Sequence, residues 1–292
     1  MAPDWLALRE PADVRARDAV ADELLPALGE HLSRRSEPRP GRPLHVLDAG
    51  AGTGAGARWL AARLGTPGAG RLPTRWTLVD HDADLLDVAG RTPGATGGGA
   101  VRVVGDLDDA AGLVREGGAA GADRVDLLTA TALLDLLRPV EADVLVGAAL
   151  AADVPLLLSL SVTGEVALDP PHPDDAALGA AFDAHQRRGG RLGPDAAPLV
   201  VERLRAAGHG VRTAASPWLL GTAGPPGADD AALLLAWVRG RAAAAVEQDA
   251  GLADRAAAWT AEREAQVAAG RLGAVVGHVE VLALPAGDDR RG

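Results

Sequence analysis

The chain has 292 residues, of which 48% are hydrophobic, and it carries a formal net charge of −11. This hydrophobic content excludes a disordered or fibrous chain, and the acidic excess argues against a nucleic-acid partner or an anionic membrane surface. Because the sequence has no Cys, Lys or Tyr, it excludes disulfides, thiolate nucleophiles, Schiff-base lysines and a Tyr–Lys catalytic pair.

No apolar run reaches the roughly 18 residues of a membrane-spanning helix. The opening stretch "MAPDWLALREPAD" lacks the cationic and apolar regions of a secretory signal. The seven histidines are scattered without the spacing of metal ligands. We therefore expect a cytoplasmic protein, with no metal site.

The first predicted elements are helical. Residues 11–35 place apolar side chains at helical spacing among charges, which predicts one or two amphipathic helices with Pro26 as a break or a start. The stretch "SEPRPGRP", residues 36–43, is typical of a linker. We therefore divide the chain into an N-terminal helical cap or lid, residues 1–40, and a main domain, residues 41–292.

From residue 44 onward, predicted strands and helices alternate. The strands are residues 44–48, 76–80, 101–105, 124–130, 155–162, 210–220 and 274–285. The helices are residues 55–64, 83–89, 109–117, 139–152, 174–188, 197–209 and 229–248, with one more helix before the last strand. Alternation at this spacing predicts βαβ units. The expected fold class is a doubly wound, mostly parallel, Rossmann-like α/β sheet of seven strands with an antiparallel edge strand.

A glycine-rich loop, within "HVLDAGAGTGAG", joins the first predicted strand to a helix. Such a loop brings backbone N–H groups against a ligand at the carboxyl edge of the sheet. Gly50-x-Gly52-x-x-Ala55 fits the dinucleotide pattern, and Asp48-x-Gly50-x-Gly52-x-Gly54 fits the acidic pattern of S-adenosylmethionine sites. The loop alone leaves both readings open.

Three carboxylates at predicted strand ends favour the second reading. Asp48 meets the cationic amino group of a methionine moiety there, whereas it repels a pyrophosphate. Asp80 is placed to accept both ribose hydroxyls, which serves either ligand. Asp106 accepts from an adenine amino group, and Leu107 packs on the ring. The competing role for each aspartate, above all Asp106, is a helix N-cap.

The stretches "VLDAGAGTG", "TLVDHDADLL", "VVGDLDD" and "RVDLLTATALLDLL" resemble, in order and spacing, the motifs of class I S-adenosylmethionine-dependent methyltransferases over residues 44–162. The flanking "WLALREPAD", "FDAHQRRGGRLGPDA" and "ASPWLLG" resemble an actinobacterial subgroup of small-molecule methyltransferases. The resemblance implies S-adenosylmethionine as the cofactor. It implies these cofactor-binding residues: Asp48, Gly50, Gly52, Gly54, Asp80, His81 against the adenine, Asp106, Leu107 and Thr129.

The segment after the fourth strand occupies the place where this family faces its acceptor. Thr129, Thr131 and Asp135 are therefore the first candidates, with Asp135 as a base or an orienting group. His185 is the second catalytic candidate. The competing roles are a solvated helix acid for Asp135 and a structural histidine for His185.

Two tryptophans are candidates for the walls of the same site. Trp5 is expected to close it as part of the N-terminal lid, and Trp218 to line the acceptor pocket or to belong to the core.

The best account is in-line methyl transfer to a small-molecule acceptor, without nucleic-acid or membrane partners and with a homodimer as one possible assembly. An NAD(P)-dependent oxidoreductase and a non-catalytic methyltransferase-like binding protein are the alternatives. The lack of Tyr and Lys, together with Asp48 and Asp106, weighs against the oxidoreductase.

Overall fold

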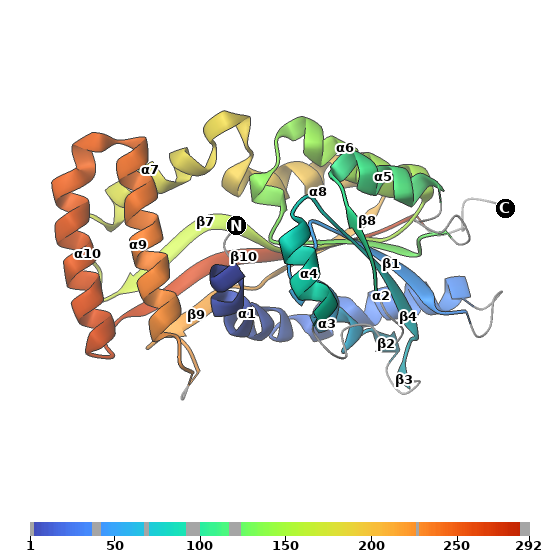
Figure 1. The fold of residues 1–292 in the computed structure, drawn as a ribbon, viewed down its shortest axis with the longest axis horizontal. Coiled ribbons are helices and arrows are strands. Elements are labelled where there is room, and N and C mark those ends of the chain that lie inside the picture. The colour runs from blue at the N-terminus through green and yellow to red at the C-terminus, as the bar shows by residue number, and fades with distance from the viewer. Residues whose placement is uncertain are drawn as a thin grey trace.

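The computed structural model describes residues 3–36, 42–66, 70–91, 100–116, 124–225 and 228–286. Eight strands form one sheet in the order β5-β4-β1-β6-β7-β10-β8, with β9 also paired to β10 (Figure 1). The strands are β1 (Leu44–Ala49), β4 (Thr74–Asp80), β5 (Ala100–Val104), β6 (Leu127–Thr131), β7 (Leu156–Asp169), β8 (Gly210–Ala215), β9 (Trp218–Gly221) and β10 (Gly273–Leu284). A separate two-stranded sheet joins β2 (Gly65–Thr66) to β3 (Gly70–Arg71).

The strands from β5 to β7 are parallel, and β10 runs antiparallel to β7, β8 and β9. This confirms the predicted α/β class and places the antiparallel pairing at the predicted end of the sheet. An eighth strand arises because residues 210–220 divide into β8 and β9 around Pro217. A proline has no N–H for the ladder, and Ser216 N–H is the last donor there, bonding His278 O at 2.9 Å.

Strand β7 is longer than its predicted range, residues 155–162. Its first six residues are buried, whereas the remaining eight are partly or fully exposed. The apolar run that marked the strand in the sequence therefore ends where the strand leaves the main core. Backbone pairing with β10 continues as far as Asp169.

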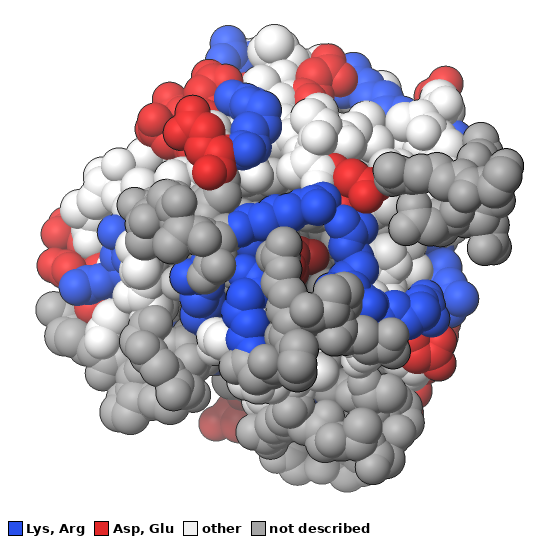
Figure 2. All heavy atoms as spheres, turned by 90° about the vertical axis from the view of Figure 1, so that its right-hand side faces the viewer, with Lys and Arg blue, Asp and Glu red and all other residues white. Residues whose placement is uncertain are grey.

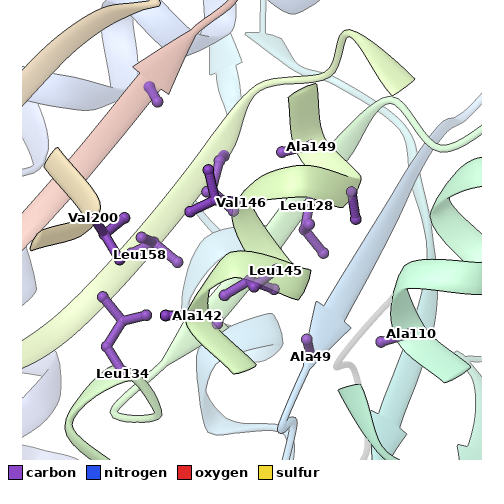
Figure 3. Close-up of a cluster of buried hydrophobic side chains, with 14 of the residues drawn as sticks. Ala49, Ala110, Leu128, Leu134, Ala142, Leu145, Val146, Ala149, Leu158 and Val200 are labelled. Carbon is purple, nitrogen blue, oxygen red and sulfur yellow. The ribbon is translucent and has the colours of Figure 1, made fainter. Parts of the chain in front are cut away.

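Helices cover both faces of the sheet. The helices α2 (Ala21–Ser36), α3 (Ala55–Ala61) and α4 (Ala83–Arg91) bury apolar side chains on one face, and α5 (Leu107–Glu116), α6 (Pro139–Ala152) and α8 (Ala196–Ala206) on the other. Alternation along β1 divides its side chains between these cores, with Val46 on the first face and Leu47 on the second. Figure 3 shows the second core, where Leu145 and Val146 of α6 point toward the sheet around Leu128 and Leu158.

A third core fills an extension at one end of the molecule. There the later parts of β7 and β10, with β9, carry the helices α1 (Pro3–Asp18), α7 (Asp175–Gln186), α9 (Ala231–Gln248) and α10 (Ala253–Ala268), as the left-hand part of Figure 1 shows. Trp218, Trp237 and Trp259 are buried in it. The extension therefore continues the sheet through β7, β10 and β9.

The N-terminal region forms two helices, but the prediction of Pro26 as a break or start is wrong. Helix α1 begins at Pro3, and the chain turns between α1 and α2, whereas Pro26 lies inside α2. Packing outweighs the missing proline N–H, because Leu28 and Leu32 of this helix are fully buried. Most of the predicted linker, residues 36–43, lies outside the described residues.

Arginine side chains gather on the face at the amino edge of the sheet (Figure 2). Arg42 forms an ion pair of 2.7 Å with Asp126, and Arg124 donates to the carbonyls of Ala152 and Asp153 at the end of α6. Arg42 therefore compensates an acid, and Arg124 binds the C-terminus of a helix. Among the described helices, none combines the length and the apolar character needed to cross a membrane.

Candidate active site

The sheet order brings the predicted cofactor residues to one edge. Asp106, Asp80 and Asp48 lie at the carboxyl ends of the neighbouring strands β5, β4 and β1, and Thr129 lies in the middle of the next strand, β6. Asp48 and Thr129 are register partners. The predicted residues are therefore neighbours in space, along the edge where parallel α/β sheets bind ligands.

The glycine loop between β1 and α3 depends on three left-handed residues. The φ angles of Gly50, Gly52 and Gly54 are +66°, +52° and +74°, which L side chains rarely adopt. A Cβ atom at Gly50 would lie 2.8 Å from a methyl carbon of Leu133. A Cβ atom at Gly52 would lie 3.8 Å from Leu6 of α1. The loop is thus a shallow cradle between α1 and the segment after β6.

Asp80 shapes this loop directly. Its Oδ2 accepts the N–H of Gly52 at 2.7 Å, and its Oδ1 accepts the N–H of Asp82 at 2.9 Å. An ionised carboxylate offers about four acceptor positions, so each oxygen retains one for a ligand hydroxyl. His81 is mostly exposed, and its Nδ1 lies 3.4 Å from Asp80 Oδ1.

Asp48 is 1% exposed. The Thr129 hydroxyl donates to its Oδ1 at 2.7 Å. Burial raises the pKa of the Asp48 carboxyl to about 7, against the opposing effects of that hydrogen bond and the positive charge of Arg17. A carboxylate with one hydrogen-bond donor in so buried a place is a partner for a cationic ligand group.

Asp106 is exposed and acts as the N-cap of α5. Its Oδ1 accepts the N–H groups of Asp108 at 2.9 Å and Asp109 at 3.1 Å. Asp106 therefore has the N-cap role that the sequence offered as the alternative. Its hydrogen bond to an adenine amino group remains a prediction. Leu107 is partly buried and packs against the second core.

A cavity of about 360 Å³ opens beside the strand ends. It lies between α1, α7, α9 and the extended parts of β7 and β10. Both catalytic candidates, Asp135 and His185, line it, as do Trp5 and Trp218, whereas Thr129 and Thr131 are not among its lining residues. The structure therefore brings together side chains that are far apart in the sequence.

The cavity adjoins the glycine loop through two segments. Leu133, which contacts the cradle at Gly50, is followed by Asp135 in the cavity wall. Helix α1 places Leu6 near Gly52 and Trp5 in the cavity. A ligand on the loop and a second ligand in the cavity would thus be neighbours.

The two catalytic candidates differ in environment. Burial raises the pKa of the Asp135 carboxyl to about 6, and the charges of Arg9 and Arg191 oppose this. A base with that pKa is ionised near neutral pH and still basic enough to take a proton. His185 Nε2 lies 3.3 Å from the exposed Glu247 of α9, so part of its hydrogen-bonding capacity is already used.

Sequence reasoning missed several residues of the cavity wall. They are Arg9, Phe182, Asp183, Trp237 and Arg241. Arg241 left a signal, because it stands in the apolar stripe of α9 that Leu234, Val238 and Ala245 continue at helical spacing. Within the described ranges, no group of three or more His, Cys, Asp or Glu residues has the arrangement of a metal site.

No family model matches the sequence, and no curated protein is significantly similar to it. Among solved structures, cyclopropane synthase MmaA2 from Mycobacterium tuberculosis is 12% identical, with a TM-score of 0.42 over 86% of this chain and 82% of that chain. The YcgJ protein from Bacillus subtilis is 12% identical, with a TM-score of 0.44 over 88% and 99%. The plantazolicin methyltransferase BpumL, in complex with S-adenosylhomocysteine, is 11% identical, with a TM-score of 0.41 over 97% and 91%. Likenesses at this identity and overlap assign neither a family nor a substrate to this chain.

Proposed function

We propose that this protein transfers a methyl group from S-adenosylmethionine to a small-molecule acceptor. The observation that carries the proposal is Asp48, a buried carboxylate directly before the glycine loop, with one hydrogen-bond donor and a pKa raised to about 7. The ammonium group of the methionine moiety would compensate it. A dinucleotide would instead bring a pyrophosphate toward it, which like-charge repulsion disfavours.

The residues at the strand ends fit an adenosyl ligand. Gly50, Gly52 and Gly54 keep side chains off the loop, so an adenosyl ligand would approach its backbone directly. Asp80 keeps acceptor positions for the ribose hydroxyls. Asp106 and Leu107 would contact the adenine, and His81 would lie against its ring.

When bound, S-adenosylmethionine supplies an electrophilic methyl group on a sulfonium. The chain holds the acceptor in line with it and excludes water, which can account for much of the acceleration. Asp135 accepts the proton that an acceptor hydroxyl or amine loses. His185 orients the acceptor from the opposite helix, α7.

Helix α1 acts as the lid of this site, in keeping with a division into a cap at residues 1–40 and a main domain at 41–292. Trp5 and Arg9 of α1 line the cavity, and Arg58 of α3 ties the helix down through an ion pair of 2.6 Å with Glu10.

The proposed partner of the enzyme is a small-molecule methyl acceptor. The charge of −11 argues against nucleic-acid and anionic membrane partners, and we propose a cytoplasmic enzyme with a homodimer as one possible assembly.

Thermal unfolding with separate ligands tests the proposal. S-adenosylmethionine and S-adenosylhomocysteine are each expected to raise the Tm by several degrees, because a ligand at about a hundred times its Kd adds about 2.7 kcal/mol. NAD⁺ and NADPH are expected to leave it unchanged. A shift with a nicotinamide cofactor alone would favour the oxidoreductase, and no shift with any of the four would favour a binding protein.

A further inference from the structure

Four arginines are buried, and one of them differs from the others. They are Arg9, Arg17, Arg241 and Arg263. Arg9 and Arg263 form ion pairs with Asp13 and Asp175, and Arg17 donates to a backbone carbonyl. Across the described ranges, Arg241 alone among the four makes neither a hydrogen bond nor an ion pair, although it is only 7% exposed.

The surroundings of Arg241 are aromatic. Its guanidinium carbon lies 4.6 Å from the ring centroid of Phe182 and 5.2 Å from that of Trp237. Its Nη2 lies against α7, where a Cβ atom at Gly179 would be 3.1 Å away. The two aromatic rings thus pack on the guanidinium of Arg241, and Gly179 packs against its Nη2. Arg241 has no hydrogen bond, yet none of its nitrogens is among the fully buried polar atoms without a partner. Its side chain lines the cavity. The remaining N–H groups therefore point into accessible space.

An uncompensated cation in this position is unfavourable in the free protein. Burial lowers the pKa of Arg241, against the attraction of Asp183 and Asp175. Asp175 is already bound to Arg263, and Asp183 lies too far away to form an ion pair. Buried charges are normally paired, so a group kept without a partner at a cavity wall calls for one from outside the chain.

We propose that Arg241 binds the anionic end of the methyl acceptor, and that this acceptor is an apolar aromatic molecule that carries a carboxylate. The acceptor role rests on the proposed methyl transfer, whereas the carboxylate site stands on the cavity alone. The planar guanidinium matches a carboxylate through two parallel N–H···O bonds. Trp5, Trp218 and Trp237 supply apolar walls for the ring.

Two groups in the cavity wall have different chemistry. Asp135, beside the glycine loop, receives the hydroxyl or amine that reacts. Arg241, on α9, holds the carboxylate. The other cation in the wall, Arg9, is already neutralised by Asp13 at 2.9 Å, and burial keeps His278 uncharged by lowering its pKa to about 3. Arg241 is thus the cation in the described wall that remains available to an anion.

Binding of 2-naphthoate and of its neutral counterpart 2-naphthamide tests the site, with tryptophan fluorescence as the readout and no adenosyl ligand present. Wild type is expected to bind the carboxylate at least about tenfold more tightly than the amide. Arg241→Met keeps an apolar side chain of similar length and is expected to abolish this preference. Its Tm is expected to equal or exceed that of wild type, because an unpaired buried charge is removed. Arg239→Met is the matched control, since Arg239 lies on the same helix but pairs with Glu264 on the surface at 2.6 Å.

Equal binding of acid and amide, retention of the preference in Arg241→Met, or no binding of either probe would overturn the proposal. A parallel titration with S-adenosylhomocysteine separates this result from the proposed function. If naphthoate binds through Arg241 and S-adenosylhomocysteine does not bind, the anion site stands and the methyl transfer fails. If the adenosyl ligand binds and naphthoate does not, the reverse holds.

Discussion

The Thr129 hydroxyl donates a hydrogen bond of 2.7 Å to Asp48 Oδ1, where both side chains are buried. One such donor only partly offsets the loss of water, so the pKa of Asp48 stays raised, at about 7. In the free protein, the carboxyl is therefore close to half protonated at neutral pH. A ligand ammonium group placed beside it would favour the ionised form and lower this pKa.

Binding of S-adenosylhomocysteine should accordingly release a proton. We expect release of up to about half a proton per site near pH 7, more at about pH 6, and almost none above about pH 9, where Asp48 is already ionised. Calorimetry in buffers of different ionisation enthalpy measures this directly. Asp48→Asn should remove the proton release, since Asn still accepts from Thr129 but does not titrate. Proton uptake, or release that persists in the variant, would contradict this role of Asp48.

The same group should weaken the free protein at alkaline pH. Because the pKa of Asp48 is higher in the folded state than the ordinary aspartate value of 3.8, the folded state binds more protons between about pH 4 and 7. The stability contributed by the protonated form is complete below about pH 4 and is lost as the pH rises through 7. Asp48→Asn should therefore raise the free energy of unfolding at about pH 8, by at most about 4 kcal/mol. A lower Tm for the variant at that pH would show that other groups in the folded protein stabilise the ionised carboxylate of Asp48.

Two glycine substitutions can separate the effect of a steric clash in the glycine loop from the effect of backbone strain alone. Gly50 and Gly208 both have positive φ angles, +66° and +86°, but only at Gly50 does a Cβ atom meet a neighbour within 4 Å. Gly208→Ala should cost about 1 kcal/mol through its backbone alone and leave S-adenosylhomocysteine binding intact. Gly50→Ala must also displace Leu133, and we expect at least about tenfold weaker binding by calorimetry. Equal affinities in the two variants would mean that the cradle is not the binding site.

Asp135 should govern the pH dependence of turnover. If it accepts a proton in its ionised form, the rate should rise with pH through about 6, the pKa to which burial raises it, and then level off. Asp135→Asn should lower turnover about 100-fold or more and leave S-adenosylhomocysteine affinity unchanged. The titration of the carboxyl itself can be followed by carbon-13 NMR. An Asp135 resonance that titrates near pH 4, or full activity in the variant, would remove Asp135 as the base.

The sequence predicted the sheet well because its signals are local. The apolar run before the glycine loop predicted β1, and the periodicity of "PVEADVLVGAALAA" predicted α6 with the bounds that the structure shows. The predicted strand 210–220 failed as one element because Pro217 divides it. Pro26 led to the opposite error, because it predicted a helix boundary that the structure does not have. The burial of Leu28 and Leu32 stabilises α2 as one helix.

The cavity could not be predicted in the same way. Phe182, Trp237 and Arg241 meet there only because α7 and α9 pack against each other across the extension of β7 and β10. Arg9 and Asp13 stand four residues apart on α1, so their pairing is local, but nothing in the local sequence says that Arg241 has no such partner. That distinction needs the positions of both side chains, and it carries the further inference.

Titration of S-adenosylhomocysteine against wild type, Asp80→Asn and Asp82→Asn tests whether the strand ends bind the adenosyl cofactor. Asp80 accepts the N–H of Gly52 and keeps positions for ribose hydroxyls, whereas Asp82 caps α4 through the N–H groups of Asp84 and Leu85. Asn is an equally good N-cap, so Asp82→Asn controls for a neighbouring loss of charge. We predict that wild type and Asp82→Asn bind S-adenosylhomocysteine with the same Kd and that Asp80→Asn binds at least about tenfold more weakly. Absence of binding to wild type, or NAD⁺ binding that depends on Asp80 in its place, would show that the strand ends do not bind S-adenosylmethionine.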